Sequence, residues 1–132
     1  MVIDTSAFIA ILTEEPDADV FHAALKAASE CAMSAFNSFE GRVVLMCAHG
    51  LGMVRDFDAF LAKVPVEIVP FDADQVVLAQ DAYRRFGKGT GHPAQLNLGD
   101  CAAYALTRLR GDRLLFKGAD FTKTDIASAL TP

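Results

Sequence analysis

Residues 91–110, GHPAQLNLGDCAAYALTRLR, run from a loop broken by glycine and proline into an apolar helix. Asp100 falls in the first turn of that helix. Behind it, Ala103, Leu106 and Leu109 recur at helical spacing, which predicts one apolar face. An acidic side chain is favourable at this end of a helix, because the helix dipole is positive there. Asp100 is therefore a good helix-start residue, and it becomes a candidate site residue if other carboxylates converge on the same place.

Outside this helix, short apolar runs alternate with longer segments of helical periodicity. Strands are predicted at residues 1–4, 31–35, 66–71 and 113–118. Further helices are predicted at residues 5–14, 16–30, 37–48, 52–64 and 72–87, with a last short helix within 119–130. Asn37 stands three residues before Glu40, which is the spacing of a capping box, so both are expected to open the 37–48 helix.

The alternation of strands and helices predicts an α/β fold in one layered domain, residues 1–132, with a small, mainly parallel sheet flanked by helices. Ligand sites of such sheets lie beyond the carboxyl ends of the strands. Asp4 ends the first predicted strand and Asp120 closely follows the last one, so both are expected at this edge. Glu40 and Asp100 open helices, and they join the other two acids only if those helices start at the same edge.

Four carboxylates in one cleft would repel one another, since two charges about 4 Å apart interact by roughly 4 kcal/mol at an effective dielectric near 20. A cation would relieve this repulsion, and ligands that are all oxygen suit Mg²⁺ or Mn²⁺ rather than zinc. Such a site can lower the pKa of a bound water and stabilise the pentavalent phosphate of a hydrolysed phosphodiester. Each acid also has a structural explanation, as a helix cap, dipole partner or turn residue, so spacing alone leaves the metal site undecided.

The composition excludes several other classes of protein. The net charge of −5 argues against a protein that coats duplex nucleic acid through bulk charge, although residues 84–132 carry an excess of basic side chains. The three cysteines lack metal-binding spacing, and there is no P-loop, G-x-S-x-G or Cys/His motif. No apolar run is long enough to span a bilayer and no signal peptide is evident, so a cytoplasmic protein without membrane contact is expected.

Four stretches carry a more specific signal, because each contains one of the acids in a recognisable context. They are MVIDTSAFIAIL (1–12), SAFNSFEGRVVL (34–45), LNLGDCAAYALT (96–107) and LLFKGADFTKTDI (114–126). In their order and spacing they resemble the successive acidic motifs of PIN-domain ribonucleases, specifically the VapC-type toxins of toxin–antitoxin pairs. The resemblance extends over nearly the whole chain.

This resemblance implies the three-layer PIN fold and a metal-dependent endoribonuclease that acts as a toxin. The acidic quartet that it implies is Asp4, Glu40, Asp100 and Asp120. Asp4 and Asp100 are the expected ligands of Mg²⁺ or Mn²⁺, and Thr5 or Ser6 would steady a metal-bound water. Many PIN domains carry a further Asp two residues before the last acid, where this chain has Gly118, so the resemblance does not fix whether one or two metals bind.

The resemblance also implies a VapB-like antitoxin as partner and RNA as substrate, and the inhibitor of an acidic site is expected to be an Arg or Lys on a flexible segment. A homodimer is expected as well, because the N-terminal helices carry more apolar residues than one core is expected to bury. The residues concerned include Phe8, Ile9, Ile11, Leu12, Phe21 and Phe57. The sequence does not specify which RNA is cleaved.

Two alternatives stay open. One is a receiver-like signalling domain, in which an acidic pocket binds Mg²⁺, an Asp takes a phosphoryl group and Lys117 contacts the phosphate. Receivers need two adjacent acids after the first strand, and this chain has only Asp4 there. The other is a degenerate PIN domain kept as a non-enzymatic binding module, although all four acids are present.

Overall fold

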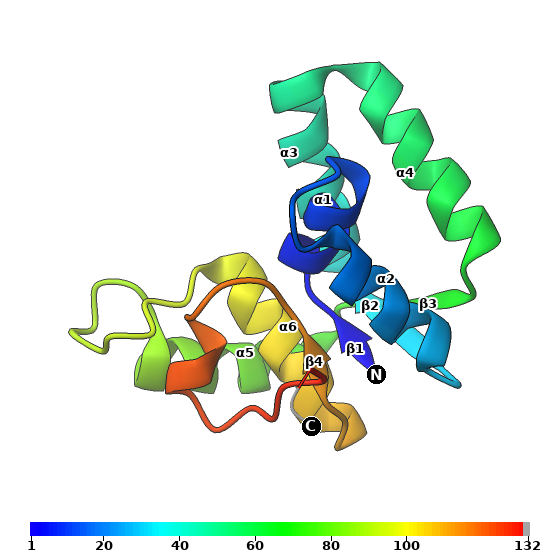
Figure 1. The fold of residues 1–132 in the computed structure, drawn as a ribbon. Helices are drawn as coiled ribbons and strands as arrows, with labels where there is room; N and C mark the ends of the chain where they lie inside the picture. Colours follow the sequence, from blue (N-terminus) through cyan, green and yellow to red (C-terminus); the bar gives the residue numbers. More distant parts are fainter. Residues whose placement is uncertain (131–132) are drawn as a thin grey trace.

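The computed structural model describes residues 1–130, and a four-stranded sheet lies at its centre (Figure 1). The strands are β1 (Val2–Ile3), β2 (Cys31–Ser34), β3 (Val66–Val69) and β4 (Leu114–Leu115). They lie in the order β3-β2-β1-β4, and each neighbouring pair is parallel. The predicted α/β fold with a small parallel sheet is therefore confirmed.

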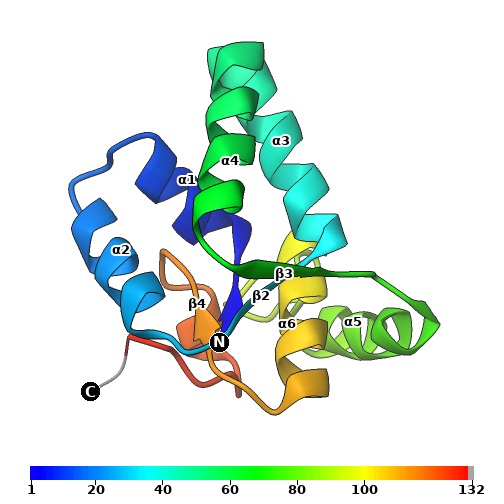
Figure 2. The same cartoon turned by 90° about the vertical axis from the view of Figure 1, so that its right-hand side faces the viewer.

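Helices cover both faces of this sheet. They are α1 (Thr5–Leu12), α2 (Ala18–Ala27), α3 (Ala35–His49), α4 (Leu51–Lys63), α5 (Ala73–Phe86), α6 (Leu98–Arg110) and the 3₁₀ helix η1 (Phe121–Lys123). Figures 1 and 2 show α1 to α4 on one side of the strands and α5 and α6 on the other. This is the three-layer arrangement that the resemblance implies.

Each face of the sheet has its own hydrophobic core, because successive side chains of a strand point to opposite faces. Val2 and Leu114 belong to the core beneath α5 and α6, whereas Ile3 and Leu115 belong to the core beneath α1 to α4. All four side chains are completely buried. Burial on both faces explains why β1 and β4 are apolar at every position, as is typical of parallel sheets.

The starts of α3 and α6 lie at the carboxyl edge of the sheet, and chain continuity explains why. α3 begins at Ala35, directly after β2 ends at Ser34. α6 leads into β4, which is parallel to β1, so α6 has to end at the opposite edge. There the amino group of Met1 lies 2.6 Å from the Asp112 carboxylate. Both helices therefore begin at the edge where Asp4 follows β1.

The first turn of α3 differs from the prediction. The helix begins at Ala35, and the Ser34 hydroxyl caps it by accepting a hydrogen bond from the Phe36 N–H at 3.3 Å. Because no loop separates β2 from α3, the last strand residue serves as the cap. Asn37 and Glu40 lie inside the helix, so the capping-box prediction is wrong.

The last short helix predicted within residues 119–130 is present as η1, and the segment after η1 is extended rather than helical. The Leu114 N–H donates to the Ala127 carbonyl at 3.0 Å, and the Ala129 N–H donates to the Leu114 carbonyl at 2.9 Å. Residues 127–129 thus run beside β4 and satisfy backbone groups that an open sheet edge would leave unpaired. A helix in this segment would leave the β4 edge uncovered.

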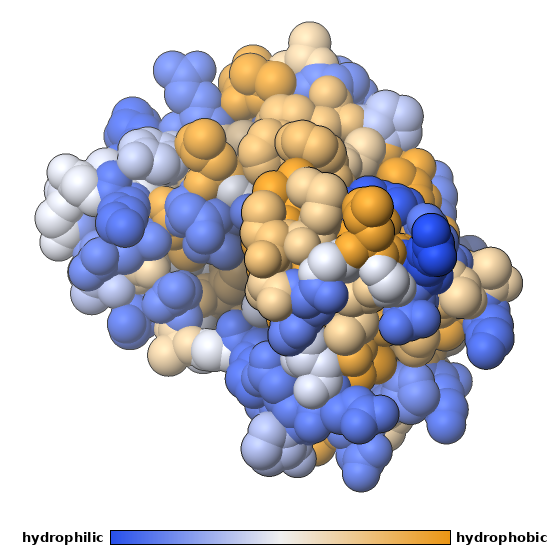
Figure 3. Space-filling model, turned by 90° about the horizontal axis from the view of Figure 1, so that it is seen from above, coloured by the Kyte–Doolittle hydropathy of each residue, from blue (hydrophilic) through white to orange (hydrophobic). Residues whose placement is uncertain are grey.

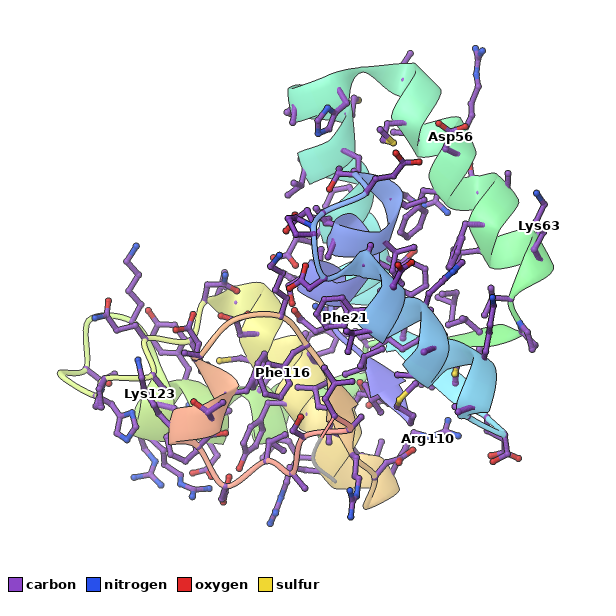
Figure 4. The ribbon with its side chains drawn as sticks, viewed as in Figure 1. Phe21, Asp56, Lys63, Arg110, Phe116 and Lys123 are labelled. Atoms are coloured by element: carbon purple, nitrogen blue, oxygen red, sulfur yellow. The ribbon has the colours of Figure 1, made fainter. Side chains whose placement is uncertain are left out.

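Charged side chains lie on the outside of both helical layers (Figure 4). Asp56 and Lys63 project from α4 into solvent and Arg110 projects from the end of α6, whereas Phe21 and Phe116 lie in the interior. Within residues 1–130, no helix combines the length and the apolar character that crossing a membrane requires.

Candidate active site

Asp4 combines a structural position with an unsatisfied acceptor. It follows β1 and caps α1: its Oδ2 accepts hydrogen bonds from the Ser6 N–H at 2.9 Å and the Ser6 hydroxyl at 2.5 Å. The side chain is buried, and its other oxygen, Oδ1, has no hydrogen-bond partner in the described part of the chain. Such an acceptor is costly in a folded protein unless a ligand completes it.

Ser6 connects Asp4 to the segment that follows β4. Its hydroxyl oxygen accepts a hydrogen bond from the Lys117 N–H at 3.0 Å while donating to Asp4. The Lys117 ammonium in turn contacts the carboxylates of Glu15 and, at 2.7 Å, Asp17 in the loop between α1 and α2. The loop that carries Asp120 is therefore anchored to the start of α1.

Glu40 lies in the second turn of α3 and faces the start of α6. Its carboxylate rests against the buried backbone of Gly99, where an added Cβ would lie far inside contact distance of both carboxylate oxygens. Glycine at position 99 therefore gives Glu40 the space to reach the site. The pKa of Glu40 is raised, mainly by burial, and the negative charge of Asp4 acts in the same direction.

Asp100 forms a reciprocal capping box with Asn97 at the start of α6. Its N–H donates to Asn97 Oδ1 at 2.8 Å, and its Oδ2 accepts from the Asn97 N–H at 2.8 Å. The helix-start role inferred from the sequence is thus confirmed. The capping box also fixes the direction of the Asp100 carboxylate, so the structural role and a site role are compatible.

The other three acids act on the ionisation of Asp100. The pKa of Asp100 is raised to about 7, first by burial and then by the negative charges of Asp4, Glu40 and Asp120. Burial also raises the pKa of Asp4. Asp120 is exposed and lies at the rim, as the residue that precedes η1. The structure therefore brings the four predicted acids to one edge of the sheet, which the sequence could only suggest.

The chemistry of this acid cluster fits a hard divalent cation. Its donors are all carboxylate oxygens, which suit Mg²⁺ or Mn²⁺, and the buried Oδ1 of Asp4 is an acceptor in need of a partner. Mutual repulsion among the acids would be relieved by positive charge. As the side chains stand, no three His, Cys, Asp or Glu residues among 1–130 form a ready-made cage, so cation binding requires side-chain adjustment.

Sequence reasoning did not identify two residues that shape the cluster, Gly99 and Asn37. Asn37 had been assigned to a helix cap, and the glycine lies at an ordinary helix start, so neither carried a distinctive signal. Thr5, one of the two candidates for steadying water, instead donates its hydroxyl to the Asn37 carbonyl at 3.2 Å. His92 has a structural role, because its Nδ1 accepts from the Ala94 N–H at 3.1 Å.

Comparison with known proteins gives the family. The PIN domain family matches residues 1–127. Ribonuclease VapC30 of Mycobacterium tuberculosis is 45% identical over 132 residues, which is 100% of both chains. The chain belongs to the VapC family of PIN-domain ribonucleases. The VapC ribonuclease resemblance seen in the acidic motifs is thereby confirmed.

Solved structures support the fold of this VapC-family chain. Mycobacterium tuberculosis VapC20, described as a sarcin–ricin loop cleaving toxin, superimposes with a TM-score of 0.76 at 15% identity, covering 96% of this chain and 95% of that one. A toxin–antitoxin complex from Klebsiella pneumoniae gives a TM-score of 0.65 at 19% identity, covering 91% and 88%. Identities this low show a shared fold, and the fold class is confirmed.

The receiver-like alternative finds no support in this VapC-family structure. A receiver needs its lysine free to meet a phosphoryl group, whereas the Lys117 ammonium is held by Glu15 and Asp17. The expected second acid beside Asp4 is also absent, since Thr5 occupies that position.

The raised pKa of Asp100 predicts how stability depends on pH. Because this pKa is about 7 in the folded protein and about 4 in an unfolded chain, the folded state binds more protons between these values. Stability should fall as pH rises from about 4 to about 7 and then level off. Asp100→Asn removes part of this decline and should be more stable than the parent at pH 8, by roughly 1–3 kcal/mol, given about 1.4 kcal/mol per pKa unit.

Thermal unfolding from pH 4.5 to 8.5 without divalent cations checks this expectation. The control is Asp56→Asn on the outer surface of α4 (Figure 4), which should follow the parent. If the unfolding temperatures of the parent and Asp100→Asn depended on pH in the same way, the pKa of Asp100 would not be raised in the folded protein.

Proposed function

We propose that this protein is the toxin of a toxin–antitoxin pair and that it hydrolyses RNA phosphodiester bonds at the acid cluster with a divalent cation. One observation carries the proposal: a buried carboxylate oxygen of Asp4 without a partner lies among acids that raise the pKa of Asp100. Membership of the VapC family supports the same reaction. The cysteines of the described chain are unpaired, which agrees with the cytoplasmic setting that we propose.

In this proposal Asp4 and Asp100 hold the cation, which is Mg²⁺ or Mn²⁺. When bound, the cation supplies positive charge to the scissile phosphate and lowers the pKa of water. Ser6 fixes the orientation of Asp4 through its two hydrogen bonds. Glu40, whose pKa is already raised, is suited to accept a proton from the attacking water. Asp120, which is exposed at the edge of the acid cluster, adds a fourth negative charge.

Cleavage of a structured RNA should require the cation and both proposed ligands. Asp4→Asn and Asp100→Asn each preserve shape but remove a charged donor, so each should lower the cleavage rate by roughly 100-fold or more while the protein stays folded. EDTA should abolish the activity of the parent, and Mg²⁺ or Mn²⁺ should restore it. Gel-resolved cleavage rates and circular dichroism are the measurements.

Asp56→Asn, on the outside of α4, is the matched control and should cleave like the parent. A folded Asp4→Asn or Asp100→Asn protein that cleaves at the parental rate would contradict the ligand assignment. A parent that binds RNA but never cleaves it, with either cation, would favour the inactive PIN module.

A homodimer is part of the proposal, although its surface differs from the one first expected. Phe8, Phe21 and Phe57 are buried in the core and cannot form an interface. A groove of about 510 Å³ instead runs between α3 and the start of α6. Phe39 and Leu98 on its walls are 66% and 68% exposed. Figure 3 shows apolar side chains gathered on the face that carries the α3–α4 turn.

A second copy covers this groove in the proposal, because symmetric dimers are the commonest way to bury such a surface. Phe39→Lys should shift the protein from dimer to monomer in light scattering at micromolar concentration. Leu109→Lys is the control: Leu109 is 51% exposed at the far end of α6 and should leave the dimer intact. A monomeric parent, or a dimeric Phe39→Lys protein, would contradict the proposed interface.

An antitoxin partner is proposed because an active ribonuclease must be restrained until it is needed. The fold neighbour from Klebsiella pneumoniae is a toxin–antitoxin complex. The acid cluster suits an Arg on a VapB-like segment, since its planar guanidinium makes paired bonds to carboxylates and stays charged. Such a group would neutralise the same charge as the cation.

Co-expression with the small protein encoded beside this chain should give a stable complex that does not cleave RNA. Replacing the basic residue that reaches the acid cluster with Gln should restore part of the cleavage while the complex persists in gel filtration. A complex that cleaves RNA as fast as the free protein would exclude inhibition by occupation of the site.

A further inference from the structure

Asn37 is a completely buried amide at the meeting point of α1, α3 and α6. Its Nδ2 donates to the Thr5 hydroxyl oxygen at 3.2 Å and to the Gly99 carbonyl at 2.9 Å. The Thr5 hydroxyl donates back to the backbone carbonyl of Asn37 at 3.2 Å. One side chain thus joins three segments that are far apart in the sequence.

Each of these segments carries one of the buried or half-buried acids. Thr5 directly follows Asp4 and Gly99 directly precedes Asp100. Asn37 itself stands one helical turn before Glu40, and residues three apart lie on the same side of a helix. The two hydrogen-bond partners of the amide are therefore sequence neighbours of Asp4 and Asp100, and Asn37 itself lies one helical turn from Glu40.

An amide side chain is energetically unfavourable at this position. Its Oδ1 is buried and has no hydrogen-bond partner within the described residues. Burying an unpaired carbonyl is unfavourable, and an apolar side chain of similar volume would avoid that cost. The hydrogen bonds to Thr5 and Gly99, rather than packing, therefore distinguish asparagine from an apolar residue here.

We propose that Asn37 is a positioning residue, which fixes the separation of the Asp4, Glu40 and Asp100 carboxylates so that one cation can be held between them. The inference rests on the proposed function. The three carboxylates repel one another, so they would spread apart if only packing held their segments. Two hydrogen bonds from one rigid, buried amide oppose that spreading directly.

Asn37→Leu separates positioning from packing. The substitution removes both amide hydrogen bonds and the unpaired Oδ1 while keeping the same branching of the side chain. The methyl groups are bulkier than the amide and the Gly99 carbonyl loses one donor, so the folded protein should unfold a few degrees lower. Its affinity for Mn²⁺, measured by calorimetry without RNA, should fall by roughly 10- to 100-fold, as for other residues that orient metal ligands. The kcat for RNA should fall more than KM changes.

Gln75→Leu is a closely matched control. Gln75 is also a completely buried amide with one bond to a backbone carbonyl, that of Pro70 at 2.6 Å, and its Oε1 is also unpaired. It lies at the start of α5 and donates to none of the acid-bearing segments. Gln75→Leu should leave the Mn²⁺ affinity unchanged, whatever it does to stability.

Thr5→Val is a second test of the same network. It removes the hydroxyl that accepts a hydrogen bond from the Asn37 amide and keeps the side-chain shape. It should lower Mn²⁺ affinity several-fold, and its effect should not add to that of Asn37→Leu, since both act on one network. If Asn37→Leu fails to fold, Thr5→Val carries the test alone.

The outcomes separate this inference from the proposed function. A parent that neither binds Mn²⁺ nor cleaves RNA would contradict the proposed function. A parent that does both, with folded Asn37→Leu or Thr5→Val binding Mn²⁺ equally well, would overturn the positioning role of Asn37.

Discussion

The repulsion between carboxylates at the carboxyl edge of the sheet is the constraint around which this structure is organised. Asp4 is buried and Asp100 is largely shielded from water, so their charges are poorly screened. Three of the four acids are each held by a separate local contact. The residues that provide these contacts are Ser6 for Asp4, Gly99 for Glu40 and Asn97 for Asp100. Rigid support at each position lets the fold keep an arrangement that is unfavourable without positive charge.

The parallel sheet makes this arrangement accessible. Its strands end at one edge, so a residue after β1 and a residue after β4 come together although they are distant in the sequence. The helices add the other two acids, because α3 begins where β2 ends and α6 has to return to the amino edge before β4. Cores on both faces of the sheet hold these helices in place, which links the apolar strand residues to the geometry of the site.

Much of this fold followed from the sequence, since alternating apolar runs and helical stripes are local signals. The place of Asp100 in the first turn of α6 and the strand before Asp4 were predicted for this reason. The start of α3 was misplaced because Asn37 and Glu40 match a capping box locally, whereas the strand before them runs into the helix without a loop. The contacts of Asn37 with Thr5 and Gly99 depend on tertiary packing, which no local pattern reports.

The anchoring of the Asp120 loop has a consequence for the order of synthesis. The Lys117 N–H donates to Ser6, and the Lys117 ammonium contacts Glu15 and Asp17. The start of the chain therefore cannot form these contacts until a segment about a hundred residues later has been synthesised. Until that segment leaves the ribosome, Ser6 lacks its second partner and β1 lacks β4 as a neighbour. A nascent chain therefore carries the first acid long before it can assemble the cluster.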